Sequence, residues 1–378
     1  MRKKVKAGVC KAAQLRDGSR HPFGMLGGVT ALGGGELEVY RQIRNAVPIL
    51  DAAIGKLVRL TGGFTVSCGN RNAEWELDRF LKTVNTGRGQ VGLESFLAAF
   101  LQSMLVYGRA VGEMVVGGNE ITAVLWGDVT KLYVQEGSSP MDFAFGQWQD
   151  AEVKIFPRQN LILFAAWNPD EENPYGASVF RSMPFLVDVL LKIYSTIGTN
   201  WERAGNVRYS VVYKPGDASG QIDAQERSEQ IAEQWSQAMQ ESRHGVVRDF
   251  VAVGDVQIKV IGADGQILDS EVPVRQILEQ LVAKTGLPPF LLGLNWASTE
   301  RMSAQQTDLL TSELWAIRRT VEPVLLRICR LWMQLHGYAE EPEIVWDEIS
   351  LQDIVEQAHA ALYRAQAEKL TAEQEETT

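Results

Sequence analysis

The three glycines Gly87, Gly89 and Gly92 form the pattern G-x-G-x-x-G, the spacing in this sequence that most resembles a chemical site. Such glycines bind a dinucleotide pyrophosphate when a strand leads into them and a helix follows, and Glu113 lies downstream, where an acid could bind the ribose. The preceding residues 75–84 have helical periodicity instead, which favours a plain loop between two helices. A dinucleotide-binding enzyme that uses this loop is an alternative function, which saturable dinucleotide binding would distinguish.

Other sequence patterns that carry catalysis are missing. There is no G-x-x-x-x-G-K-[ST], which excludes phosphoryl transfer by a P-loop, and no G-x-S-x-G elbow for a nucleophilic serine. The four histidines are His21, His244, His336 and His359. They show no i, i+4 pairing and no neighbouring cysteine, so no metal site is predicted. The acidic residues 170–172 could bind a cation, but a solvated loop explains them more simply. We therefore predict a protein that is not an enzyme and has no cofactor.

Aromatic residues could still contact nucleic acid, because a tryptophan ring can stack on a base. The candidates are Trp201, Trp235, Trp296, Trp315 and Trp332. Trp235, Trp315 and Trp332 fall on apolar helix faces, which predicts that they lie in the core or between subunits. Trp296 falls in a loop and is the candidate of most interest.

The overall charge limits the possible partners. The 378 residues include 37 Lys and Arg against 47 Asp and Glu, a formal net charge of −10. A protein that grips DNA phosphates usually has a basic face, so tight nucleic-acid binding is disfavoured. Passage of DNA past an acidic wall is compatible with this charge, because like charge would keep the polymer from sticking.

Cysteine content and apolar runs indicate the compartment. Cys10, Cys68 and Cys329 are odd in number and far apart, which argues against a disulfide framework and fits a reducing compartment. The basic residues 1–4 are followed by no apolar segment of a signal peptide, so secretion is not expected. The longest apolar runs, such as residues 96–107, are too short to span a bilayer, so no membrane partner is expected.

Hydrophobic periodicity predicts an α+β fold in the first half of the chain rather than a series of β-α-β units. The basic, then glycine-rich residues 1–38 are expected to form a flexible arm. Helices are expected over residues 39–60, 75–84 and 93–107, and Pro48 is expected within the first turn of the first of these helices. Strands are expected over residues 64–67, 108–116, 121–125, 131–134, 152–155 and 156–164.

The second half is expected to place a small α/β segment between helices. A helix is predicted over residues 178–204, with Pro184 marking its start or a bend. A strand over residues 208–213, a helix opened by a capping box at residues 223–226, and a β-hairpin of residues 246–253 and 256–261 follow. A strand over residues 343–346 and a polar helix over residues 351–370 end the chain.

The stretch around which these elements are organised joins a helix over residues 274–284 to a much longer one. Gly286, Pro288 and Pro289 are expected to end the first helix sharply. Ser298 or Thr299 could cap the second, and Pro323 lies inside it, where a kink is expected. The apolar stripe of the long helix consists of Leu310, Leu314, Ile317, Val321, Val324, Leu325, Ile328 and Trp332. We expect this stripe to be buried by cyclic packing against identical neighbours.

This order of short helix, double-proline stop, loop and long kinked helix resembles the stem helix, tunnel loop and kinked helix of tailed-bacteriophage portal (head-to-tail connector) proteins. Residues 107–113 and 156–178 are similar to passages of the portal wing domain, and the resemblance covers about residues 40–338. It implies a wing (39–177), a first stem helix (178–206), a clip (207–269), a second stem helix (270–287), a tunnel loop (288–301), a long kinked helix (302–337) and a small crown with tail (338–378).

The resemblance also implies a function and partners. The chain would form a ring, typically a dodecamer, at the capsid vertex of a virion assembled in the bacterial cytoplasm, and double-stranded DNA would be packaged and ejected through it. Its partners would be the terminase large subunit, the major capsid and scaffolding proteins and a head-tail adaptor. A minor capsid or adaptor scaffold protein that forms no ring is the alternative.

Two sets of residues would carry this function. The channel or tunnel loop would comprise Leu292, Gly293, Leu294, Asn295, Trp296, Ser298, Thr299, Glu300 and Arg301. The motor and adaptor would dock on the clip through Trp235, Met239, Arg243 and Arg248. We hypothesise that Arg301 contacts DNA phosphate and that Glu300 limits how tightly the loop holds it.

Overall fold

The computed structural model describes residues 35–137, 143–149, 152–171, 173–205, 208–214, 255–261, 270–294 and 300–349, together with the single helical residues 229, 233 and 236. The chain divides into two compact units. The larger comprises Leu32–Asp188 and Arg275–Thr378, and the smaller comprises Met1–Ala31 and Val189–Val274.

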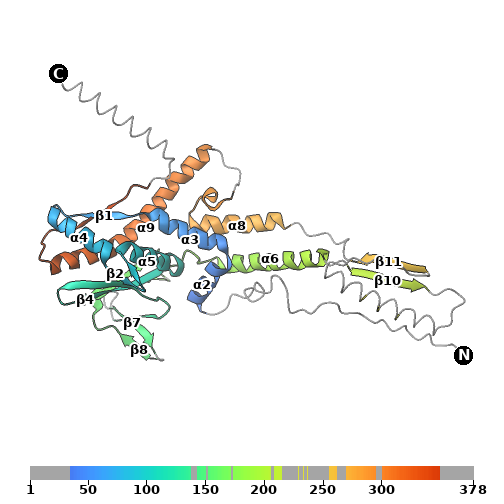
Figure 1. Ribbon diagram of the computed structural model, residues 1–378, viewed down its shortest axis with the longest axis horizontal. Helices are drawn as coiled ribbons and strands as arrows, with labels where there is room; N and C mark the ends of the chain where they lie inside the picture. The colour runs from blue at the N-terminus through green and yellow to red at the C-terminus, as the bar shows by residue number, and fades with distance from the viewer. Residues whose placement is uncertain are drawn as a thin grey trace, which may run out of the picture. The chain divides into compact units, whose positions relative to one another are not determined.

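The larger unit is built around helix α5 (Leu93–Tyr107), which packs between a sheet and other helices. Eight of its residues are buried: Leu93, Phe96, Leu97, Phe100, Leu101, Met104, Leu105 and Val106. A helix that is apolar on most of its surface needs cover on all sides. Strands β2, β4 and β5 contact one part of α5, and helices α2 (Glu36–Ala46), α3 (Pro48–Thr61) and α4 (Arg71–Thr83) contact the rest (Figure 1).

The sheet beside α5 has five strands in the order β3-β2-β5-β4-β9. Their bounds are β2 (Asn85–Gly87), β3 (Gln90–Val91), β4 (Arg109–Gly117), β5 (Glu120–Trp126) and β9 (Ile162–Ala166). Strand β4 pairs antiparallel with β5, where Met114 faces Val124, and with β9, where Val111 faces Phe164. The mixture of helices packed on a largely antiparallel sheet confirms the predicted α+β fold.

A second sheet of three strands, in the order β6-β7-β8, lies at the edge of the larger unit (Figure 1). Its strands are β6 (Leu132–Glu136), β7 (Phe143–Gln149) and β8 (Glu152–Ile155). One face packs on a core cluster of Val111, Val129, Phe145 and Ile162. The sequence analysis missed β7, whose alternation of aromatic and small residues ends at Gln147.

Two helices occupy residues 39–60, where one was predicted, but Pro48 does lie in the first turn of the second helix, as expected. Val47 adopts an extended conformation, and Pro48 is the first residue of α3. Proline has no N–H to continue the hydrogen bonds of a preceding helix, but its fixed φ suits the first helical position. Helix α2 begins at Glu36, inside the stretch expected to form the flexible arm.

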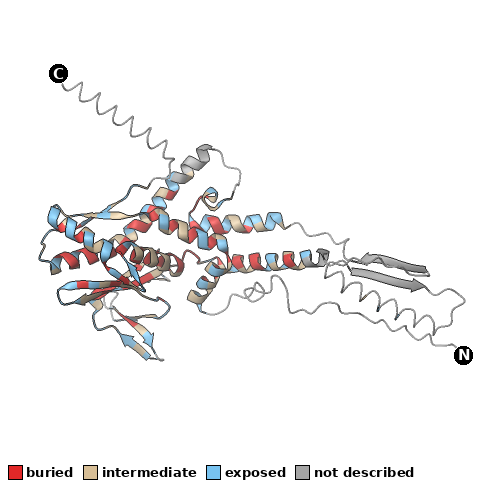
Figure 2. Cartoon of the chain, viewed as in Figure 1, coloured by how far each residue is buried: buried red, intermediate tan, exposed pale blue. Residues whose placement is uncertain are grey.

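The long helix α9 spans Glu300–Leu335 without a break at Pro323, and it bends along its course (Figure 1). Its eight predicted stripe residues are all buried, with exposed fractions between 0% and 6%. Helices α3 and α4 and strand β9 of the same unit contact α9. Figure 2 shows the buried residues along this helix. The expectation that identical neighbours bury this stripe is therefore wrong, since the chain's own core covers it.

Strand β12 (Glu343–Trp346), which the sequence assigned to the crown, pairs antiparallel with β1 (Phe64–Ser67) from the wing. Trp346 faces Phe64, and their ring centroids are 5.5 Å apart. Both strands have the predicted bounds, as do α5 and β8. The pairing joins segments almost 280 residues apart in the chain, which periodicity within each segment cannot reveal.

In the smaller unit, β10 (Arg208–Lys214) pairs antiparallel with β11 (Asp255–Ile261), so that Tyr213 faces Val256. The hairpin partner predicted for β11, residues 246–253, lies outside the described residues, and so does the polar helix predicted over residues 351–370. Helix α6 spans Pro184–Gly205, so Pro184 marks its start. Every helix in the described ranges is too short or too polar to cross a membrane.

The two described cysteines have free thiols, and Cys329 is fully buried in α9. Burial raises the pKa of the Cys329 thiol to about 12, which makes this side chain unreactive near neutral pH. Cys10 lies outside the described residues. In the described part of the chain no three His, Cys, Asp or Glu side chains gather as metal ligands.

Candidate functional site at the junction of α8 and α9

The predicted tunnel loop begins where helix α8 (Glu271–Thr285) ends. The Thr285 hydroxyl donates a hydrogen bond of 2.7 Å to the carbonyl of Val282 and accepts one of 3.3 Å from the Leu287 N–H. Gly286 follows with φ +73°, a left-handed conformation that glycine adopts without the steric cost of a Cβ. These contacts turn the chain sharply out of the helix.

The double proline is followed by a short 3-10 helix, η2 (Pro289–Leu292), rather than by an open loop. Gly293 closes it with φ +76°, and the Leu294 N–H donates to the carbonyl of Pro289 at 3.1 Å. Helix α3 contacts η2, while Phe290 remains 39% exposed. The first predicted loop residues, Leu292, Gly293 and Leu294, therefore belong to a folded turn that rests on the core.

The tip of the loop lies outside the described residues, which resume at Glu300. Asn295, Trp296, Ser298 and Thr299 are among the residues not described. Glu300 and Arg301 form the beginning of α9, and their side chains are also outside the description. The structure thus describes both ends of a five-residue connection, residues 295–299, between η2 and α9.

Arginine side chains fasten α9 to the rest of the larger unit. Arg318 donates through Nε to the carbonyl of Thr61 at 2.8 Å. Arg327 donates to the carbonyls of Ile162 at 3.0 Å and Asn160 at 2.7 Å. Pro323 lies between these two anchors. The helix beyond the loop is therefore held on the ends of α3 and β9.

Arg318 is an unusual anchor because it is only 1% exposed. Neither Nη1 nor Nη2 has a hydrogen-bond partner, and the rings of Trp315 and Trp346 lie 5.0 Å and 5.1 Å from its guanidinium carbon. Burial lowers the pKa of Arg318, and the negative charge of Asp347 opposes this shift. Sequence reasoning missed this residue, because one arginine beside an apolar stripe carries no signal of burial.

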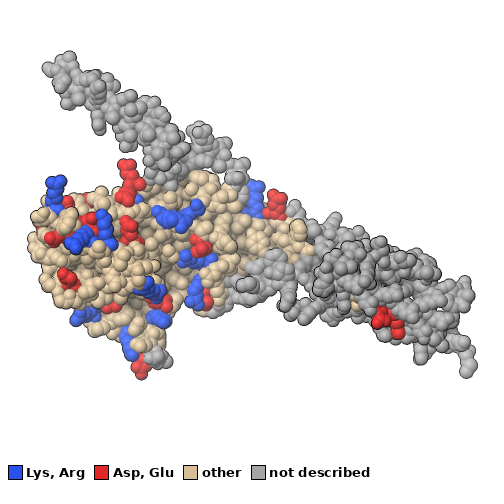
Figure 3. Space-filling view, in the orientation of Figure 1, with Lys and Arg blue, Asp and Glu red and all other residues tan. Residues whose placement is uncertain are grey.

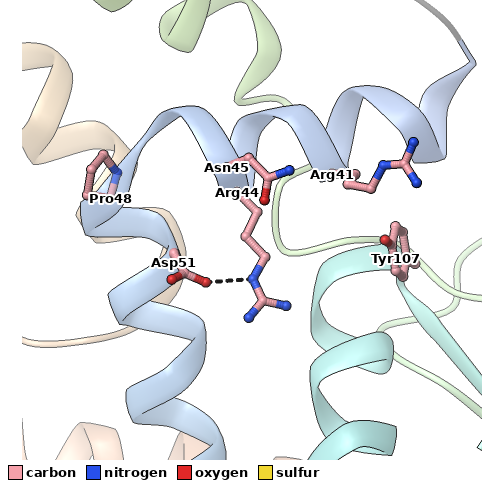
Figure 4. Close-up of a pocket in the computed structure, with 6 residues that line it drawn as sticks. All are labelled: Arg41, Arg44, Asn45, Pro48, Asp51 and Tyr107. Carbon is pink, nitrogen blue, oxygen red and sulfur yellow. Dashed lines mark hydrogen bonds and ion pairs between the residues drawn. The ribbon is translucent and has the colours of Figure 1, made fainter.

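A pocket of about 550 Å³ lies where α2, α3 and the end of α5 meet (Figure 4). Arg44 donates through Nε to Asp51 Oδ1 at 2.6 Å, and Arg41 pairs with Glu38. The side chain of Tyr107 lines the pocket beside Arg41, and burial raises its pKa. Both arginines are already paired with carboxylates, so the arrangement does not resemble an anion site or a catalytic centre.

The G-x-G-x-x-G residues form a β-hairpin and not the predicted loop between helices. Gly87 ends β2, Gly89 lies in the turn, and β3 follows before Gly92 caps α5. Arg88 in this turn stacks over the ring of Trp126 at 4.2 Å. A dinucleotide site needs the glycines to lead directly from a strand into a helix, so this geometry gives no support to the dinucleotide alternative.

The remaining candidates have mixed outcomes. Trp332 is buried, in line with the prediction that it lies in the core or between subunits. Trp315 is 44% exposed, so a contact between subunits stays a prediction for this residue, and Trp201 is 66% exposed. Asp170 pairs with Arg181 and accepts hydrogen bonds from Asn173, so it organises its own loop.

The proposed clip residues, Trp235, Met239, Arg243 and Arg248, lie outside the described residues. The histidines His21, His244 and His359 also lie outside them.

On the face of the larger unit drawn in Figure 3, Lys and Arg side chains are interspersed with Asp and Glu. A surface of mixed sign does not create the extended positive potential that binds a nucleic-acid backbone tightly.

No protein-family model and no curated protein matches the sequence. Chains of solved structures do match. The chain is similar to a chain of the virion of a native gene transfer agent (GTA) particle, with 16% identity and a TM-score of 0.62 over 90% of each chain. It is also similar to a chain in the neck of an empty GTA particle computed with C6 symmetry, with 17% identity, 89% of this chain and 91% of the other covered, and a TM-score of 0.63.

A third match is a chain in the neck of a native GTA particle computed with C12 symmetry, with 17% identity, coverage of 85% and 86%, and a TM-score of 0.59. A weaker likeness, with 10% identity and a TM-score of 0.46, is to an HK97-family phage portal protein from Corynebacterium diphtheriae and supports no conclusion. The three stronger matches show the fold: over most of its length the chain folds like these particle chains.

Proposed function

We propose that the chain is a portal protein, one subunit of a ring at a capsid vertex through which double-stranded DNA is packaged and ejected. In this proposal the chain performs no chemistry and needs no cofactor. A separate terminase motor docks on the segment between α6 and α8 during packaging, and a head-tail adaptor replaces it afterwards. Major capsid and scaffolding proteins surround the ring while it assembles in the bacterial cytoplasm.

The observation that carries this proposal is the likeness to GTA neck chains over about nine tenths of both chains. Those necks were computed with C6 and C12 symmetry, which supports a ring of repeated subunits and fits a dodecamer. The order of α8, double-proline stop, η2, connection and α9 supports the same function, because it corresponds to the stem, tunnel loop and kinked helix of portal proteins.

In this proposal, residues 292–301 reach into the channel, and the segments on both sides of them are held by contacts with the rest of the subunit. On one side η2 rests on α3, and on the other α9 is fastened through Arg318 and Arg327. A loop held in this way can contact DNA without carrying the rest of the subunit with it. Its length, five residues between Leu294 and Glu300, limits how far it can move.

The first test is the mass and shape of the purified full-length protein, measured by mass photometry and negative-stain imaging. The proposal predicts particles of many subunits with a central hole. Particles that remain monomers or small oligomers, also when capsid and scaffolding proteins are co-expressed, would contradict it and favour a scaffold protein that forms no ring.

A second test concerns Arg301 as the contact to phosphate. Arg301→Ala should reduce DNA packaging or retention in particles while leaving ring assembly unchanged, because one charge-assisted contact per subunit is lost. Arg319→Ala is a matched control, since this arginine is exposed on the same helix. Equal packaging by the two variants would show that Arg301 has no such role.

A further inference from the structure

Helix α9 carries a small apolar patch outside its buried stripe. Leu309 is 69% exposed and Trp315 is 44% exposed. Ser312 lies one helical turn from each of them, and Ala316 lies one turn after Ser312. Two large apolar side chains therefore flank two small ones. We refer to Leu309, Ser312, Trp315 and Ala316 as the α9 patch.

The chain leaves the described residues close to this patch. The ring of Trp315 lies 5.0 Å and that of Trp346 lies 5.1 Å from the guanidinium carbon of Arg318. Trp346, the last residue of β12, also donates through Nε1 to Glu322 of α9 at 3.0 Å. Since the described residues end at Ile349, the segment that follows starts near the Trp315 end of the patch.

The sequence of that segment has a matching pattern. Residues 351–370 are predicted to form a polar helix with one thin apolar stripe, which consists of Ile354, Ala358, Ala361 and Leu362. Like the α9 patch, this stripe has two large and two small side chains. Large side chains of one helix pack into the spaces over small side chains of another, which lets the two backbones approach closely.

Charges at the ends of the two surfaces are complementary. A segment that starts near Trp315 and covers the patch runs towards Leu309, antiparallel to α9. Arg364 follows the stripe of the segment, and the exposed Asp308 precedes the patch on α9. Antiparallel packing therefore brings a guanidinium close to a carboxylate. Parallel packing would instead place Asp308 near Asp353.

We propose that residues 351–365 dock as an amphipathic helix on the α9 patch of their own chain. This inference goes beyond the proposed portal function and stands without it. The chain connection selects the patch, because β12 contacts β1 and α9. Among the described side chains of these three elements, the large apolar ones that are exposed are Leu309, Trp315 and Val345. Val345 lies on the face of β12 opposite Trp346, since side chains alternate along a strand, and the other two belong to the patch.

The small area of the patch is sufficient because the segment is tethered. A separate protein needs about 800 Å² of contact on each partner to bind stably. A short connection such as residues 347–350 instead gives an effective concentration in the millimolar range. A millimolar affinity then suffices to populate the docked state, and burial of a few apolar side chains supplies it.

Docking would affect the part of α9 that is nearest to the predicted tunnel loop. The patch lies between the connection 295–299 and the anchor Arg318, where α9 continues directly from the loop. A docked segment would cover these turns and restrict their movement with the loop.

Hydrogen–deuterium exchange of the full-length protein, followed by mass spectrometry, tests the docking. In the wild type, peptides from residues 351–365 should exchange at least about tenfold more slowly than unstructured chain. Leu309→Ser and Leu362→Ser should each remove about tenfold of this protection, because each deletes one large side chain of the contact. Leu309 lies outside the segment, so its effect reports docking and not helix propensity. Trp75→Ser is the matched control, since Trp75 is 65% exposed on α4 and its loss should leave the segment unchanged.

A charge exchange tests the orientation. Asp308→Arg should speed exchange in the segment several-fold, because it brings two guanidinium groups together, and the addition of Arg364→Asp should restore the wild-type rate. Failure of the second change to restore protection would overturn the antiparallel packing.

Two further results would contradict the docking itself. Equal protection in the wild type and in Leu309→Ser, or no protection in the wild type, would show that the segment does not bind the patch. Protection that falls when the protein is diluted would assign the contact to a second copy instead of the same chain. Either result leaves the portal function untouched, since that function is tested by ring assembly and DNA packaging.

Discussion

At the scale of single residues, Arg318 ties three segments together. Its Nε donates to the last turn of α3, where the helix dipole places negative partial charge, and its guanidinium lies near the rings of Trp315 and Trp346. Gly62 makes room for it: its φ is +76°, and a Cβ there would lie 3.0 Å from Arg318 Nη2. The position of α9 on α3 and β12 thus depends on one buried cation.

Truncation of Arg318 tests this role. Arg318→Ala should lower the free energy of unfolding by about 3 kcal/mol, because it leaves a cavity and removes the donor to the Thr61 carbonyl. Arg318→Met should cost less, since it fills the space and removes the buried charge. Urea denaturation followed by circular dichroism measures both. The adjacent exposed Arg319→Ala serves as control, and an equal loss in the two alanine variants would contradict the anchor.

Glu74 should make part of the protein's free energy of unfolding depend on pH in the acid range. Its carboxylate accepts hydrogen bonds from the N–H groups of Cys68 and Gly69 and from the Ser67 hydroxyl, at 2.8, 3.1 and 2.9 Å. The Cys68 N–H, followed by the Ser67 hydroxyl, lowers the pKa of Glu74. A carboxyl whose pKa is lower in the folded state stabilises the fold above its unfolded pKa, and this contribution is lost as the pH falls through the folded pKa.

We expect the melting temperature of Glu74→Gln to depend less steeply on pH in acid than that of the wild type. Between about pH 5 and pH 3 the melting temperature of the wild type should fall more steeply than that of the variant, whose amide does not titrate. Scanning fluorimetry across this range measures the difference. Parallel curves for the two proteins would mean that Glu74 contributes nothing to the pH dependence.

At the scale of elements, the start of α6 is set by a close approach of two glycines. Gly108 ends α5 with φ +80°, and the Trp167 N–H donates to its carbonyl at 2.7 Å. A Cβ on Gly176 would lie 1.9 Å from that carbonyl oxygen. Ser178 then donates from its hydroxyl to the carbonyl of Val106, which fixes the chain before α6 begins.

Alanine substitution at Gly176 should therefore be severe. Gly176→Ala combines an unfavourable φ of +102° with a backbone collision, and we expect a loss of about 3 kcal/mol or more, or no folded protein. Gly118→Ala is the matched control, because φ is +65° there but nothing lies within 4 Å, so the cost should be near 1 kcal/mol. Chemical denaturation that ranks the two variants equally would refute the close-approach argument.

At the scale of the whole molecule, the net charge of −10 affects assembly more than folding. Identical subunits brought together repel one another, and salt screens this repulsion over a Debye length of about 8 Å at physiological ionic strength. An apolar contact between subunits does not weaken in salt.

Assembly should accordingly strengthen with salt. Raising sodium chloride from about 0.01 M to about 0.15 M should lower the concentration at half assembly, as measured by mass photometry or sedimentation velocity. Dissociation on addition of salt would indicate that ion pairs between subunits, rather than apolar contact, hold the copies together.

The sequence by itself determined the elements whose signal is local. The periodicity of the α9 stripe, the bounds of α5, β1, β8 and β12, and the stop at Gly286 follow from neighbouring residues, because burial repeats with the period of the helix or strand. The same local periodicity predicted the α+β fold that the structure has.

Only the tertiary structure decided which partners these elements meet. The pairing of β1 with β12 and the burial of Arg318 against Thr61 depend on contacts between segments distant in sequence. The stripe of α9 shows the same limit. Its apolar pattern was predicted correctly from the sequence, but the segments that bury it were not. An apolar face requires cover, but its pattern is the same whether the cover comes from its own chain or from a neighbour.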